Sequence, residues 1–108
     1  MANQREYFRF TIPLEGSFSL DGRAEQPLQV VNISPGGLLG EVSAPIPAPH
    51  RAVVRLRLDG LYLEAEAMCM RADYDPPYRV AFCFLNTGND FVSQLQSYLF
   101  HKAHPDVR

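Results

Sequence analysis

The chain has 108 residues, of which 46% are hydrophobic, and its formal net charge is −2. This length suits one domain with one core, and the charge provides no general basic field, so non-specific nucleic-acid binding is not expected. No apolar run is long enough to span a membrane, and the polar start Met1–Glu6 is unlike a signal peptide. We therefore expect a cytoplasmic protein with a single domain over residues 1–108.

Residues 1–13 are charged and aromatic, show no strand period and end at Pro13, which cannot donate a ladder hydrogen bond. We expect them to form an extended, loosely held arm. In residues 14–86, by contrast, apolar and polar side chains alternate in six short segments, as in half-buried strands. These segments are residues 15–20, 26–33, 38–42, 54–58, 61–69 and 78–85.

Turn signals separate these segments. Asp21-Gly22 and Asp59-Gly60 are typical of turns between antiparallel strands, and the three prolines of residues 45–49 exclude a central strand there. Short strands at this spacing predict a small six-stranded antiparallel β-barrel.

The last segment, residues 88–104, predicts a helix. Gly88, Asn89 and Asp90 provide an N-cap, and the helix then has one apolar stripe, formed by Phe91, Leu95, Tyr98 and Leu99. The strand at 78–85 is apolar on both faces, so we expect this helix to cover its outer face. The predicted fold class is all-β with one C-terminal helix.

Two arginines four residues apart, Arg5 and Arg9, lie in the aromatic arm. A guanidinium group pairs with two phosphate oxygens or with guanine O6 and N7, and it stacks on purine rings. Alone, such a pair more commonly represents solvated surface charges.

The stretch from Asn32 to Gly37 predicts a tight turn between two apolar runs. Asn32 and Ser34 have short side chains that cap backbone groups, and Gly36 and Gly37 permit the positive φ values of a sharp reversal. The turn gathers an amide, a hydroxyl and backbone N–H groups, an arrangement that suits an anion or a guanine edge. Without other signals it is also consistent with an ordinary strand connection.

Together, Arg5-x-x-x-Arg9 and Asn32-x-Ser34-x-x-Gly37 resemble the two-part signature of the PilZ domain family, RxxxR followed by [D/N]xSxxG. The resemblance covers nearly all of the chain. It implies a receptor for the bacterial second messenger cyclic di-GMP, with these five residues as ligand contacts. It also implies an adaptor that changes conformation and signals through an effector protein in motility, biofilm or pilus control.

Three further residues are candidate ligand contacts: Gln4, Gly36 and Tyr74. Gln4 stands where family members often carry another arginine, which argues against a stacked ligand dimer. Tyr74, before the sixth strand, could stack on a guanine, although an ordinary turn aromatic is the alternative. Asn32 stands where many members have Asp; an amide keeps the hydrogen bonds but forms no ion pair.

No catalytic set, cofactor motif or metal-ligand spacing is visible, so we expect neither an enzyme nor a metalloprotein. Cys69 and Cys83 fall opposite one another if the last hairpin turns near residue 76, and we expect them to be reduced core thiols. Two alternatives to the receptor stay open. One is a degenerate PilZ-like interaction module that binds no nucleotide, and the other is a small barrel for single-stranded nucleic acid, which the acidic balance disfavours.

Overall fold

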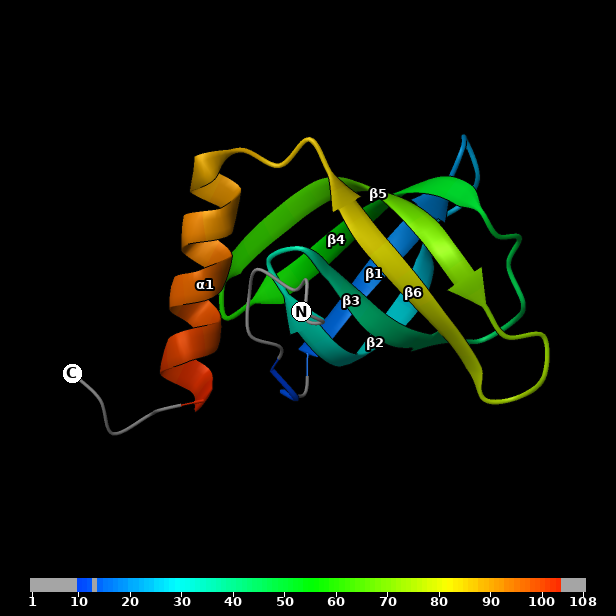
Figure 1. Ribbon diagram of the computed structural model, residues 1–108, viewed down its shortest axis with the longest axis horizontal. Helices are drawn as coiled ribbons and strands as arrows, with labels where there is room; N and C mark the ends of the chain where they lie inside the picture. Colours follow the sequence, from blue (N-terminus) through cyan, green and yellow to red (C-terminus); the bar gives the residue numbers. More distant parts are fainter. Residues whose placement is uncertain (1–9, 13, 104–108) are drawn as a thin grey trace, which may run out of the picture.

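The computed structural model describes residues 10–12 and 14–103, which form six strands and one helix (Figure 1). The six strands contain the six alternating segments of the sequence, but the fourth begins at His50 instead of residue 54 and the fifth ends at Ala72 instead of residue 69. In chain order the elements are β1 (Leu14–Leu20), β2 (Gln26–Ser34), β3 (Gly37–Val42), β4 (His50–Leu58), β5 (Leu61–Ala72), β6 (Tyr78–Leu85) and α1 (Asn89–Ala103).

The strands close into an antiparallel barrel in the order β1-β2-β3-β6-β5-β4, with β4 pairing back onto β1. Most neighbours are successive hairpins, whereas the β3–β6 and β1–β4 pairs join segments that are distant in sequence. The proline-rich residues 43–49 connect β3 to β4. The predicted six-stranded barrel with a C-terminal helix is confirmed.

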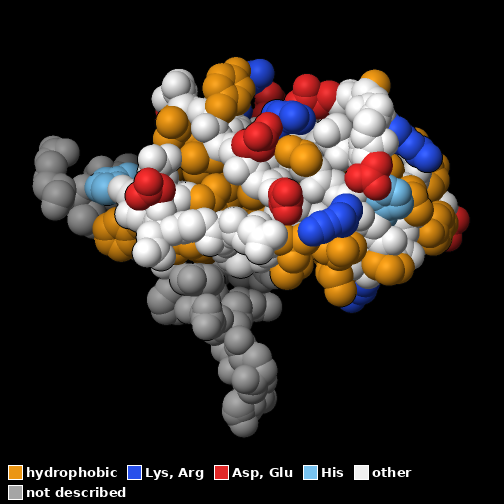
Figure 2. All heavy atoms as spheres, turned by 90° about the horizontal axis from the view of Figure 1, so that it is seen from above, with side chains coloured by type: hydrophobic (Ala, Val, Ile, Leu, Met, Phe, Trp, Pro, Cys, Tyr) orange, Lys and Arg blue, Asp and Glu red, His pale blue; other side chains and the backbone are white. Residues whose placement is uncertain are grey.

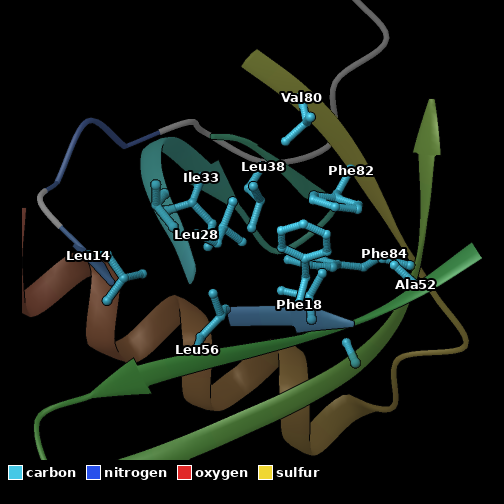
Figure 3. Packing of buried hydrophobic residues seen from close by; sticks show 14 of the residues in the cluster. Leu14, Phe18, Leu28, Ile33, Leu38, Ala52, Leu56, Val80, Phe82 and Phe84 are labelled. Carbon is cyan, nitrogen blue, oxygen red and sulfur yellow. The ribbon is translucent and has the colours of Figure 1, made fainter. Parts of the chain in front are cut away.

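The barrel interior is filled by the apolar side chains of the alternating pattern. Phe18 of β1 is fully buried, and its ring centroid lies 5.7 Å from that of Phe82 of β6 (Figure 3). Ile33 and Leu38, which flank the β2–β3 turn, are also buried in this core. Burying each such side chain stabilises the fold by about 1.5–3 kcal/mol, so the core holds the strands on both sides of that turn in place.

Acidic and basic side chains are mixed on the outside of the barrel. On the face seen in Figure 2 they are interspersed, and no patch of one sign forms. The ion pairs join Arg51 to Glu66, Arg55 to Glu25 and Glu64, Arg57 to Glu15, Arg79 to Glu41, and Lys102 to Asp59. Exposed pairs of this kind contribute at most about 1 kcal/mol each.

Helix α1 lies against one end of the barrel (Figure 1). Its Leu95 and Leu99 are fully buried in the core. The ring of Phe91 packs edge-on against that of the inward-facing Phe84, with 5.4 Å between the ring centroids. Near its C-terminus, Lys102 contacts Asp59 at 2.9 Å, and this hydrogen bond raises the pKa of Lys102.

The expectation that the helix covers the outer face of β6 is therefore wrong. The helix packs on inward-facing residues at the open end of the barrel, where they would otherwise meet water. On the outer face of β6, Cys83 is exposed and Ala81 is half-buried.

Candidate functional site

The turn between β2 and β3 is held by its own polar groups. Ser34 is 3% exposed, and its Oγ accepts a hydrogen bond of 3.2 Å from the backbone N–H of Gly36. The Gly36 carbonyl in turn accepts a hydrogen bond of 3.0 Å from the backbone N–H of Phe84. The turn is thus fixed both to its own serine and to β6.

Gly37 is required for a different reason from the one that the sequence suggests. Its φ does not lie in the left-handed region. Instead, a Cβ atom at this position would lie 2.3 Å from the carbonyl oxygen of Phe82 in the neighbouring strand. Gly37 therefore permits the close approach of β3 to β6 that positions the turn.

The end of the N-terminal arm is paired with β2. Phe10 and Ile33 exchange two backbone hydrogen bonds, of 2.8 and 2.9 Å between nitrogen and oxygen. Phe10 and Ile12 also pack partly buried against the core. The expectation of a loosely held arm is wrong at these residues, because Phe10 is anchored between the positions of Asn32 and Ser34.

Two β-bulges change which side chains face the outside of the barrel. In β2 the register shifts between Val30 and Asn32, and in β5 it shifts between Cys69 and Arg71. Each bulge inserts one extra residue, so the strand resumes its alternation in the opposite phase. Asn32 and Arg71, which simple alternation would direct inward, instead line the outside of the barrel.

These bulges flank a groove of about 520 Å³ on the outside of the barrel, which we call the outer groove. Its lining combines the turn with the outer faces of β3, β5 and β6. The lining residues are Asn32, Gly36, Gly37, Leu38, Leu39, Met70, Arg71, Ala81, Phe82 and Cys83. The groove therefore offers an apolar floor with polar groups at its sides, a combination suited to a planar base with polar edges.

The structure brings together part of the predicted site. Asn32, Gly36 and Gly37 line the outer groove, and Ser34 supports the turn from beneath. Tyr74 does not line the groove; it is 64% exposed in the turn between β5 and β6. Gln4, Arg5 and Arg9 lie outside the described residues.

Sequence reasoning missed the far side of the groove, which β5 and β6 supply. The sequences of both bulged strands could have indicated this side, because each strand has a polar residue at a position where the alternation predicts an apolar one. Val30 is followed two positions later by Asn32, and Cys69 by Arg71. A polar residue in the inward phase of an otherwise regular strand indicates a bulge.

The bulge in β5 also separates the two cysteines. Cys69 faces Phe82 rather than Cys83, and it is buried whereas Cys83 is exposed. The predicted register, with the two cysteines opposite one another, is therefore wrong, and the expectation of a core thiol is wrong for Cys83. Burial raises the pKa of the Cys69 thiol.

Other kinds of site were sought in the same part of the chain. Among residues 10–12 and 14–103, no group of three or more His, Cys, Asp or Glu side chains could hold a metal ion. The 15-residue α1 is too short to cross a membrane, and the structure describes no other helix.

The family model of the PilZ domain matches residues 3–101, and the chain belongs to this family. The matched range spans the positions of the arginine pair and of the Asn32–Gly37 turn. No curated protein sequence matches the chain significantly.

Solved structures share the fold at low sequence identity. The PilZ domain of YcgR from Escherichia coli, solved with c-di-GMP, has a TM-score of 0.76 at 20% identity over 95% of this chain and 94% of its own. The PilZ domain of CeSA from a cellulose-synthesizing bacterium has a TM-score of 0.72 at 20% identity, over 90% of this chain and 99% of its own.

MotI/DgrA, an inhibitor of motility from Bacillus subtilis, has a TM-score of 0.79 at 18% identity. The match covers 97% of this chain but 53% of MotI/DgrA, so the chain spans about half the length of that protein.

Proposed function

We propose that this protein is a cytoplasmic receptor for cyclic di-GMP that signals through a protein partner. The observation that carries the proposal is the pairing of Phe10 with Ile33. It attaches the arginine-bearing arm directly beside the turn that carries Asn32 and Ser34. Because Arg9 directly precedes Phe10 in the sequence, this pairing supports a site in which both halves of the family motif contact one ligand.

In the proposed complex, Arg5 and Arg9 bind the ligand from the arm side. Cyclic di-GMP offers two phosphates and two guanine bases, and each is a good partner for a guanidinium group. Asn32 and the backbone of Gly36 and Gly37 line the opposite wall. Ser34 fixes the shape of that wall through its hydrogen bond to Gly36.

Support for this ligand also comes from the E. coli YcgR domain, whose structure contains c-di-GMP on the same fold. The apolar floor of the outer groove is consistent with a stacked base. The mixed surface charge gives no comparable basis for a long nucleic acid.

Isothermal titration of the whole chain with cyclic di-GMP tests the proposal. Saturable binding with one ligand per chain is expected, and cyclic di-AMP, which has the same phosphates but different base edges, should bind more weakly. Absence of any heat of binding, confirmed by an unchanged melting temperature at saturating ligand, would favour a PilZ-like module that works without nucleotide.

A further inference from the structure

Arg71 stands out among the arginines of the barrel strands. Arg51, Arg55, Arg57 and Arg79 each form an ion pair with a glutamate. Arg71 forms no ion pair with any residue in the described part of the chain. Its exposed side chain lines the outer groove instead.

The register places Arg71 directly across the groove from the motif. Asn32 pairs with Leu39, Leu39 with Ala81, and Ala81 with Arg71, so these four residues form one row across β2, β3, β6 and β5. Neighbouring strands are about 4.8 Å apart, so the three spacings between β2 and β5 separate the backbones of Asn32 and Arg71 by roughly 14 Å. Arg71 and the motif residue Asn32 are the two polar ends of this row.

The two residues in the middle of the row, Leu39 and Ala81, are uncharged, and they leave room for a flat ring above them. Leu39 and Ala81 are half-buried, and Met70 beside them is 55% exposed. A purine that lies on this floor presents one edge toward Asn32 and another toward Arg71. The unbranched Met70 side chain can adapt to the face or rim of such a ring.

Both ends of the row depend on a bulge. Without the irregularity between Cys69 and Arg71, the arginine would point into the core, as Asn32 would without its counterpart in β2. Bulges near binding sites commonly redirect one side chain in this way. Both bulges direct a polar side chain into the same groove.

We infer that Arg71 is a further ligand-binding residue, which donates from its guanidinium fork to O6 and N7 of a guanine held on the groove floor. The inference rests on the proposed function, and it assigns a role to a residue outside the two-part motif. A guanidinium group matches the two acceptors of this guanine edge, and the corresponding adenine edge presents a donor in place of one acceptor. Arg71 thus contributes to affinity and to the preference for guanine.

The experiment is titration of cyclic di-GMP into the wild-type chain, Arg71→Gln and Arg57→Gln. Arg57 is the matched control, because it lies on β4, pairs with Glu15 and does not line the outer groove. Arg71→Gln should weaken binding roughly tenfold or more, and Arg57→Gln should stay within about twofold of wild type. The loss should persist at about 0.5 M salt, where long-range attraction between charges is screened.

Circular dichroism melting of all three proteins checks the fold, which Arg71→Gln should leave unchanged because the side chain is exposed and has no ion pair in the described chain. If Arg71→Gln binds as tightly as wild type while Arg5→Ala loses binding, the role of Arg71 is overturned and the receptor proposal stands. Equal losses in Arg71→Gln and Arg57→Gln, or a loss that disappears at high salt, overturn it in favour of general charge steering. No binding by the wild-type chain overturns both proposals.

Discussion

Phe10 and Ile33 exchange backbone hydrogen bonds of 2.8 and 2.9 Å, although 23 positions separate them in the sequence. Ile33 itself is fully buried, so the pair is anchored in the barrel core. This attachment places the end of a segment without strand periodicity next to the turn between β2 and β3.

The first prediction concerns the arginines of the arm. Arg5→Ala and Arg9→Ala should each weaken cyclic di-GMP binding by about ten- to a hundredfold, since a charge-assisted contact contributes roughly 1.5–3 kcal/mol. Titration calorimetry measures the loss, with Arg57→Ala as a control that removes the same charge from β4. If both arm variants bind like wild type, the assignment of the site to this side of the barrel is wrong.

The second prediction concerns Asn32. If its amide faces the arm arginines, Asn32→Asp adds an ion pair and should leave binding equal or tighter. Gln29→Glu makes the same change of charge on an exposed position of β2 outside the outer groove, and it should have little effect. A clear loss of affinity in the Asp variant with an intact fold would show that the carboxylate meets a ligand phosphate instead.

The third prediction concerns Gly37. Gly37→Ala should lower the free energy of unfolding by about 1–3 kcal/mol, because the new methyl group must displace the Phe82 backbone. Gly88→Ala is the control: its Cβ meets no atom within 4 Å, so its cost should stay under about 1 kcal/mol, the usual effect at a helix N-cap. Urea denaturation measures both values, and equal costs would show that β3 and β6 can separate freely.

The fourth prediction uses the two thiols as reporters. Cys83 is exposed in the outer groove, whereas Cys69 is buried and its pKa is raised, which disfavours the reactive thiolate. In the native protein an alkylating reagent should therefore modify Cys83 first, and saturating cyclic di-GMP should slow that reaction. Peptide mass spectrometry identifies the modified residue. Unchanged alkylation of Cys83 in the bound state would place the ligand elsewhere.

The fifth prediction concerns the signal. Binding can reorder the arm only through contacts that exist in the closed state and are absent from the open one. On hydrogen exchange, cyclic di-GMP should increase protection in residues 4–9 and around residues 32–37, and α1 should change little. The amides of Phe10 and Ile33 should already be protected without ligand, because they are hydrogen-bonded to each other. A larger change in α1 than in the arm would point to a different switch.

The sequence by itself determined the strands, the helix and one side of the candidate site. Regular alternation identified six strands because each has one face in the core, and the stripe of Leu95 and Leu99 identified α1 for the same reason. The turn from Asn32 to Gly37 was recognisable because its chemistry is local: short polar side chains, a proline and two glycines lie within a few residues of one another.

The tertiary structure decided what depends on contacts between distant segments. Strand pairing, rather than backbone conformation, explains Gly37, because the atom that excludes a side chain there belongs to Phe82. Barrel closure left α1 at an open end instead of over β6, so the outer face of β6 became the floor of a groove. The two bulges then reversed the alternation in β2 and β5 and placed Asn32 and Arg71 in one row. Such a row cannot be read from one strand at a time, because it exists only once four strands are in register.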